Sequence, residues 1–132
     1  IQRLVGATQA LVIGDPLDPG TDVGPVIDEE AAAKIRSYID KAKSEGCKLD
    51  LEMRLPTDKS FVASSSGGRR YVAPVIFSGV KPTHTIAREE IFGPVLAVMH
   101  APDFRTALDM ANASPYKLTG GVFMTKVNDL SW

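Results

Sequence analysis

Two adjacent carboxylates, an aromatic ring and a Gly–Pro break follow one another within residues 88–95. The segment reads Arg-Glu-Glu-Ile-Phe-Gly-Pro-Val, and the side chains of Glu90 and Phe92 are the ones that could contact a ligand. The carboxylate of Glu90 can accept hydrogen bonds from a vicinal diol, such as two hydroxyls of a ribose. The ring of Phe92 can pack against the same sugar or its base. The spacing taken by itself favours a simpler interpretation, a capped turn with a phenylalanine in the core, and both interpretations stay open here.

The neighbouring residues restrict the backbone of this segment on both sides. Gly93 and Pro94 end any helix that begins near Ala87. The uncharged run over residues 95–99 predicts a buried strand. We therefore expect Glu90 and Phe92 to lie where the chain enters a strand.

A long amphipathic helix is predicted upstream. Asp28 is a favourable N-cap, and Gly46 is a suitable residue just past the helix end. The predicted buried stripe of this helix is Ala31, Ile35, Tyr38, Ile39 and Ala42.

Further elements follow from periodicity and turn residues. Residues 1–10 are typical of the end of a helix, residues 56–70 of a surface loop, and strands are expected at 48–53, 71–77, 95–100 and 118–124. Pro74 indicates an edge strand or a bulge. Asp103 can cap a second helix, whose apolar face is predicted to be core: Phe104, Ala107, Leu108 and Ala111. The fold class is α/β with a mixed, largely parallel sheet and flanking helices.

Composition excludes several classes of function. Of the 132 residues, 15 are Lys or Arg and 16 are Asp or Glu, so no basic field favours nucleic acid. A membrane-spanning helix needs about 20 apolar residues, and no apolar run approaches that length. Cys47 is the only cysteine, which rules out an internal disulfide and suits a cytoplasmic location. Without a histidine beside it in the chain, Cys47 is expected to be structural, and His84 is given no role.

The motifs resemble those of the aldehyde dehydrogenase superfamily. Residues 88–95 are similar to its REEIFGPV signature, and residues 116–123 to its YGLTGGVF stretch, with Lys117 in place of a glycine. Residues 13–16 and 22–28 resemble its GDP and DVGPVID stretches. The sequence of residues 22–28 is most similar to that of the 1-pyrroline-5-carboxylate dehydrogenases, the branch that oxidises glutamate semialdehyde. Such enzymes also form the C-terminal part of bifunctional enzymes of proline catabolism.

The resemblance implies a cofactor role for the two residues named first. In the family the second glutamate of the signature holds the nicotinamide ribose of the dinucleotide and the phenylalanine packs beside it. These roles correspond to Glu90 and Phe92, and Glu89 is expected to matter less. The implied cofactor is NAD, or NADP, and the implied partners are an aldehyde substrate and further copies of the enzyme. No metal site is expected.

The family's cysteine nucleophile, oxyanion-stabilising asparagine and general-base glutamate have no counterpart motif in these residues. We therefore expect residues 1–132 to be one partial domain, a fragment from the part of the catalytic domain after the nucleophile, cut through an element at both ends and inactive alone. Two alternatives stay open. One is a general aldehyde dehydrogenase of another substrate class, and the other is a non-catalytic binding or oligomerisation module that retains the fold.

Overall fold

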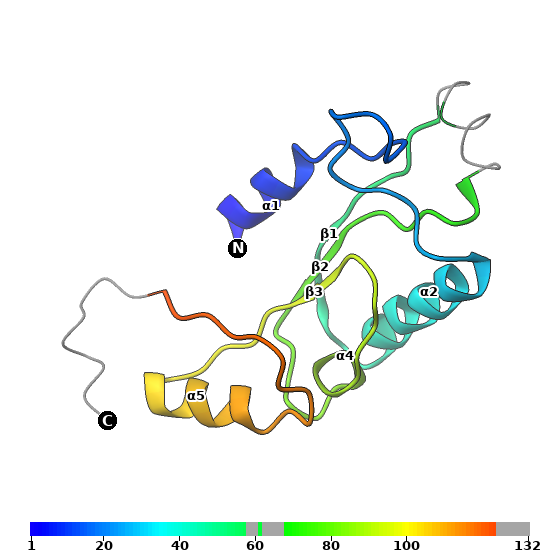
Figure 1. Cartoon of the computed structure of the whole chain (residues 1–132). Coiled ribbons are helices and arrows are strands. Elements are labelled where there is room, and N and C mark those ends of the chain that lie inside the picture. Colours follow the sequence, from blue (N-terminus) through cyan, green and yellow to red (C-terminus); the bar gives the residue numbers. More distant parts are fainter. Residues whose placement is uncertain (58–60, 62–67, 124–132) are drawn as a thin grey trace.

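The structure is a computed structural model that describes residues 1–57, 61 and 68–123 (Figure 1). The helices are α1 (Gln2–Gln9), α2 (Glu29–Ser44), α4 (Thr85–Arg88) and α5 (Phe104–Asn112). The strands are β1 (Lys48–Glu52), β2 (Val75–Ser78) and β3 (Val95–Ala97). The predicted loop at 56–70 and the end of the predicted strand at 118–124 lie partly outside the described residues.

The strands form a three-stranded mixed sheet in the order β1-β2-β3. β1 is antiparallel to β2, with a bulge between Leu49 and Leu51, and β2 is parallel to β3. This confirms the α/β class and the mixed sheet, although only one of the two pairings is parallel. The edge position indicated by Pro74 is wrong, because β2 is the central strand. Pro74 directly precedes that strand, and its carbonyl accepts the amide of Met53 at 3.0 Å.

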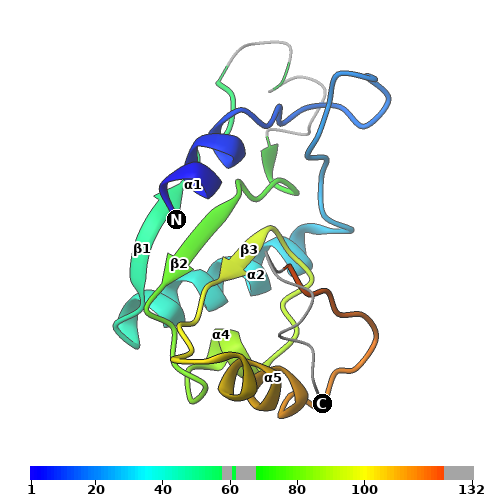
Figure 2. The same cartoon turned by 90° about the vertical axis from the view of Figure 1, so that its left-hand side faces the viewer.

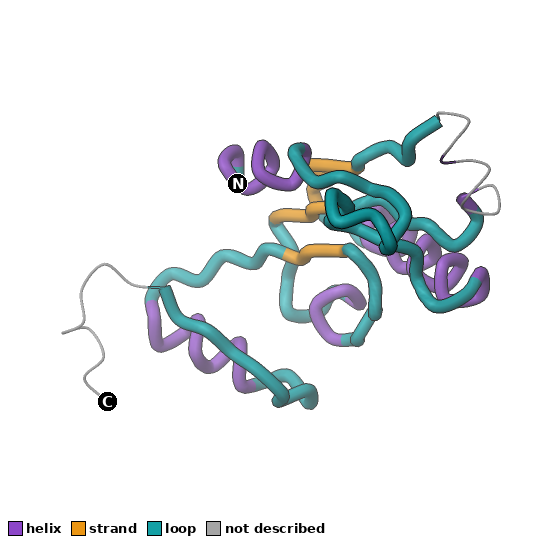
Figure 3. Tube along the Cα trace, turned by 45° about the horizontal axis from the view of Figure 1, so that its top comes forward, coloured by secondary structure: helices purple, strands orange, loops and turns teal. Residues whose placement is uncertain are grey.

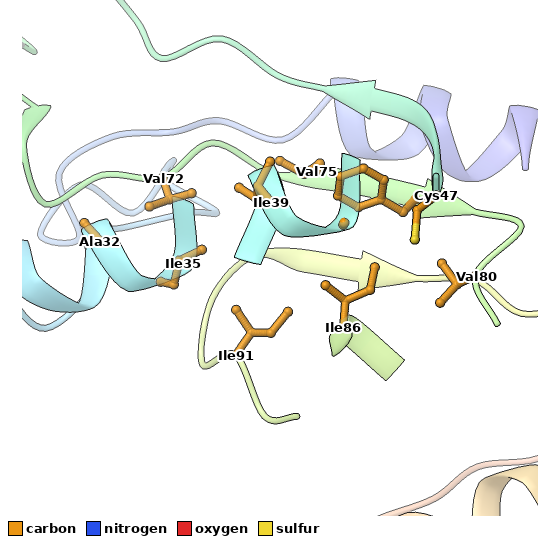
Figure 4. Packing of buried hydrophobic residues seen from close by; sticks show 11 residues of the cluster. Ala32, Ile35, Ile39, Cys47, Val72, Val75, Val80, Ile86 and Ile91 are labelled. Atoms are coloured by element: carbon orange, nitrogen blue, oxygen red, sulfur yellow. The ribbon is translucent and has the colours of Figure 1, made fainter. Parts of the chain in front are cut away.

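One face of the sheet is covered by α2 and α4 (Figure 2). The Asp28 carboxylate accepts the Ala31 amide at 2.7 Å, and Gly46 takes φ 81°, so both predicted ends of α2 are confirmed. Ala32, rather than Ala31, is the fully buried alanine of the first turn. The main core contains the following residues, most of which Figure 4 labels: Ala32, Ile35, Ile39, Ala42, Cys47, Val72, Val75, Phe77, Val80, Ile86 and Ile91.

A smaller cluster holds the loop that follows α1. Ile13 forms a parallel bridge to Val23 and is buried with Phe61 and Tyr71. The rings of Phe61 and Tyr71 meet edge to face at 4.8 Å, and the Tyr71 hydroxyl donates to the Gly14 carbonyl at 3.0 Å. Burial raises the pKa of Tyr71, which keeps this hydroxyl a donor.

The C-terminal elements correct three predictions. Asp103 does cap α5, accepting the Thr106 amide at 2.7 Å, but no residue of α5 is buried, so its apolar face is not core. Residues 118–123 form no strand, and Leu118 is 95% exposed. β3 is an edge strand rather than a buried one, with Leu96 44% exposed. An amphipathic stripe predicts which face becomes buried only if something packs on it. Here α5 stands off from the sheet (Figure 3), and its apolar residues are at most half-buried.

Among the described residues, no helix has both the length and the apolar character required to cross a membrane.

Candidate functional site

Residues 89–94, here called the Glu90 loop, connect α4 to β3 and alternate between two environments. Glu89 and Ile91 face α2: the Glu89 carboxylate accepts the hydroxyl of Tyr38 at 2.6 Å, and the Ile91 side chain is 9% exposed within the main core (Figure 4). Glu89, Glu90 and Phe92 are all exposed, and of these three Glu89 is the one hydrogen-bonded to α2. The pattern is not that of a regular extended strand, because Phe92 has a positive φ of 55°.

Gly93 and Pro94 fix the far end of the loop. A Cβ on Gly93 would lie 2.6 Å from Cδ1 of Ile35, so the backbone of the loop rests directly on α2. The Pro94 carbonyl accepts the Val75 amide at 2.9 Å, which joins the loop to the central strand. The predicted position of Glu90 and Phe92 just before a strand is therefore confirmed. The preceding helix ends at Arg88, earlier than the Gly–Pro break requires.

Phe92 has an unusual backbone. It is the one non-glycine residue with a positive φ, 55°, among the described residues. This conformation costs an L-residue roughly 1–2 kcal/mol and persists only where its neighbours are fixed. The ring is 82% exposed, so the interpretation of Phe92 as a core residue is wrong. The core position belongs to its neighbour Ile91, which is buried in the main core.

Glu90 offers its carboxylate to the outside of the loop. The structure gives this carboxylate no hydrogen bond or ion pair to any described residue. An ionised carboxylate only accepts hydrogen bonds, and its two oxygens can receive two hydroxyl donors at once. A sugar diol is a chemical complement of this group, and the neighbouring Phe92 ring offers an exposed apolar face.

Cys47 and His84 are in contact, although no motif in the sequence pairs them. Cys47 Sγ lies 3.0 Å from Nδ1 of His84, and the same nitrogen accepts the backbone amide of Lys81 at 3.1 Å. Because that amide can only donate, Nδ1 is an acceptor and the thiol is the donor. Burial, with the nearby Glu45 carboxylate, raises the pKa of Cys47. No histidine stands next to Cys47 in the chain, but the fold brings His84 against it. A buried protonated thiol is a structural group rather than a nucleophile, as the sequence predicts.

The start of α4 is held by Glu45, which sequence reasoning missed. Its carboxylate accepts the Thr85 hydroxyl at 2.6 Å and the Thr85 amide at 2.8 Å. These two bonds lower the pKa of Glu45, so the carboxylate is ionised at neutral pH. No sequence signal links these groups, since the two residues are 40 positions apart. Among the described residues, no cluster of three or more His, Cys, Asp or Glu side chains could hold a metal ion.

Comparison with known proteins gives consistent matches over nearly all of the chain. The sequence model of the aldehyde dehydrogenase family matches residues 1–131. A betaine aldehyde dehydrogenase of Rhizobium etli is 42% identical over 123 residues, which are 93% of this chain and 24% of that protein. The chain thus spans about a quarter of the length of the curated relatives it matches.

Solved structures agree with the sequence matches. An aldehyde dehydrogenase of Mycobacterium tuberculosis complexed with NAD⁺ superposes with a TM-score of 0.80 at 34% identity, over 97% of this chain and 24% of that chain. A betaine aldehyde dehydrogenase of Staphylococcus aureus in complex with NAD⁺ gives a TM-score of 0.81 at 30% identity, over 96% and 24% of the respective chains.

Proposed function

This chain belongs to the aldehyde dehydrogenase family, and we propose that it forms part of an enzyme that oxidises an aldehyde with NAD, in which Glu90 and Phe92 contact the ribose of the cofactor. The observation that carries this proposal is the geometry of the Glu90 loop. Its two outward residues are a carboxylate without a protein partner among the described residues and a bare aromatic ring, on a backbone anchored to α2. Two structural neighbours, each similar over a quarter of its length, are complexes with NAD⁺.

The described residues fit a dinucleotide ribose at the loop. NAD, when bound, accepts a hydride from the substrate carbon. Glu90 would accept the two ribose hydroxyls, and the Phe92 ring would cover the apolar side of the sugar. Neither residue takes part in bond breaking, so their contribution is to place the cofactor.

The covalent step would use a thiolate from outside this chain. Cys47 is 7% exposed, donates to His84 and has a raised pKa, so it does not supply a nucleophile at neutral pH. The nucleophile and the general base would come from the roughly three quarters of the relatives' length that this chain does not span.

Two charged aldehydes are candidate substrates. The sequence DVGPVID at residues 22–28 favours glutamate semialdehyde as the substrate and a role in proline catabolism. The sequence relatives, which are betaine aldehyde dehydrogenases, favour betaine aldehyde. A site built for a carboxylate leaves polar groups unpaired with other substrates, whereas a quaternary ammonium is bound by aromatic faces. Comparing kcat/KM for both aldehydes and an uncharged one of equal length decides between them; equal values for all three would indicate a general aldehyde dehydrogenase.

The experiment for the site itself is Glu90→Gln in the complete protein. The amide keeps the shape but loses one acceptor and the charge, so we expect a loss of about 1.5–3 kcal/mol in cofactor binding or hydride transfer. Glu30→Gln is the matched control, because Glu30 is an exposed carboxylate in the first turn of α2. Unchanged kcat and unchanged KM for NAD in Glu90→Gln would contradict the assignment.

We also propose a cytoplasmic location and self-association into a homo-oligomer. Exposed apolar side chains support the second point, among them Leu96, Leu118 and Phe123. Sedimentation of the complete protein tests it, and a monomer at micromolar concentration would contradict it.

A further inference from the structure

We propose that α2 positions the Glu90 loop, with Tyr38 and Glu45 as its positioning residues. The inference rests on the proposed function, since it concerns how Glu90 is presented to the cofactor. It extends that function to side chains that are far from Glu90 in sequence and do not touch the proposed ribose.

The first attachment lies next to Glu90 itself. The Tyr38 hydroxyl donates to the Glu89 carboxylate at 2.6 Å, and the Nζ of Lys34 lies 5.9 Å from the centre of the Tyr38 ring. The ring is half-buried against the main core, which restricts its movement. Because Glu89 and Glu90 are consecutive, fixing the Glu89 side chain on α2 limits where the Glu90 backbone can lie.

The second attachment holds the other end of α4. Glu45, directly after α2, accepts both the hydroxyl and the amide of Thr85, the first residue of α4. Cys47 donates at 3.0 Å to His84, which directly precedes Thr85 in the chain. The short helix is therefore tied at its first residue to Glu45, at the C-terminal end of α2, and just after its last residue to Tyr38 through Glu89. These contacts hold α4 and the start of the Glu90 loop on α2.

The third attachment is apolar. Ile91 is buried in the core with Ile35, and Gly93 lies against Ile35. Three alternate positions, 89, 91 and 93, thus contact α2 through Tyr38 and Ile35. Glu90 and Phe92 make none of these contacts, and Phe92 keeps a strained φ of 55°. The placement of Glu90 is therefore determined by its neighbours' contacts with α2 and not by contacts of its own.

The test is Tyr38→Phe in the complete protein, measured as KM for NAD and KM for the aldehyde. The variant keeps the ring and removes one donor to a carboxylate. We expect KM for NAD to rise about tenfold while KM for the aldehyde stays unchanged. Loss of a merely structural contact lowers the amount of active enzyme, and hence apparent kcat, but leaves KM for NAD unchanged.

Tyr71→Phe is the matched control, because it removes the same atom from a tyrosine that donates to Gly14 in the other cluster. It should leave KM for NAD unchanged. A second variant, Glu89→Ala, should raise KM for NAD as Tyr38→Phe does, and the double variant should be no worse than either single one, since both break the same bond.

The outcomes separate this inference from the proposed function. If Glu90→Gln raises KM for NAD and Tyr38→Phe does not, the positioning role is overturned and the proposed function stands. If neither variant changes KM for NAD, both are overturned. An equal rise in Tyr38→Phe and Tyr71→Phe also overturns the positioning role, because it reflects general loosening of the fold.

Discussion

Adding one methyl group at Gly93 should destabilise the protein, because the Glu90 loop lies against α2 without space between them. A Cβ there would be 2.6, 2.7 and 2.8 Å from Cδ1, Cγ1 and Cγ2 of Ile35. Carbon atoms in van der Waals contact are about 3.5–4.0 Å apart. Ile35 is 1% exposed and surrounded by core side chains, so it cannot turn away freely. Overpacking of this kind costs about 1–3 kcal/mol, which is our expectation for Gly93→Ala.

Urea unfolding of the 132-residue chain, followed by far-ultraviolet circular dichroism at one protein concentration, measures this cost. A lower midpoint at unchanged slope reports a loss of stability. Gly6→Ala is the matched control, because a Cβ on Gly6 in α1 would meet no atom within 4 Å. Alanine is the better helix former by about 0.8–1.0 kcal/mol, so this control should not destabilise.

A second substitution tests whether Ile35 is the cause. Ile35→Val removes the methyl group nearest to the added Cβ and by itself should cost about 0.5–1.5 kcal/mol. In the Gly93→Ala background it should cost less, because it removes the shortest of the three close contacts and lets the remaining side chain shift. Full stability of Gly93→Ala, or effects that add within about 0.3–0.5 kcal/mol, would refute the close packing of the loop on α2.

The remaining predictions concern pH and catalysis. The lowered pKa of Glu45, caused by the Thr85 hydroxyl and amide, contributes stability that is present above the ordinary value of 4.5 and is lost as the pH falls through the folded-state pKa. Thr85→Val should reduce the loss of stability at acid pH. A Glu45 pKa at or above 4.5 in an NMR titration would disprove the proposed effect of Thr85. The 132-residue chain alone should fold as an α/β unit yet form no NADH with either candidate aldehyde. It should bind NAD in the millimolar range or more weakly, about −4 kcal/mol at best, by calorimetry. Turnover that disappears on Cys47→Ala would contradict the interpretation of Cys47 as a structural residue.

Local chemistry made several elements predictable from the sequence. The N-caps of Asp28 and Asp103 accept amides three residues ahead, and Gly46 supplies the positive φ after α2. Each feature depends on residues within one turn, so neighbouring side chains suffice to specify it. The family also followed from the sequence, since the Glu90 loop and the stretches around it form contiguous motifs. The substrate branch stays a prediction, because the sequence relatives include betaine aldehyde dehydrogenases rather than enzymes specific for glutamate semialdehyde.

Burial was predicted less well where it depends on a distant partner. The apolar pattern of α5 and of residues 118–123 is regular, yet none of these residues is buried in the described part of the chain. Periodicity identifies a face that can be buried; whether it is buried depends on what packs against it.

The arrangement of the candidate site was determined only by the tertiary structure. The sequence identified Glu90 and Phe92 by residue type, but it could not show that positions 89, 91 and 93 turn inward. That choice follows from contacts with α2, such as the Tyr38–Glu89 bond between residues 51 positions apart. The contact of Cys47 with His84 spans 37 positions in the same way. Such pairs have no signature in local spacing, because the two side chains meet only after the helix has packed on the sheet.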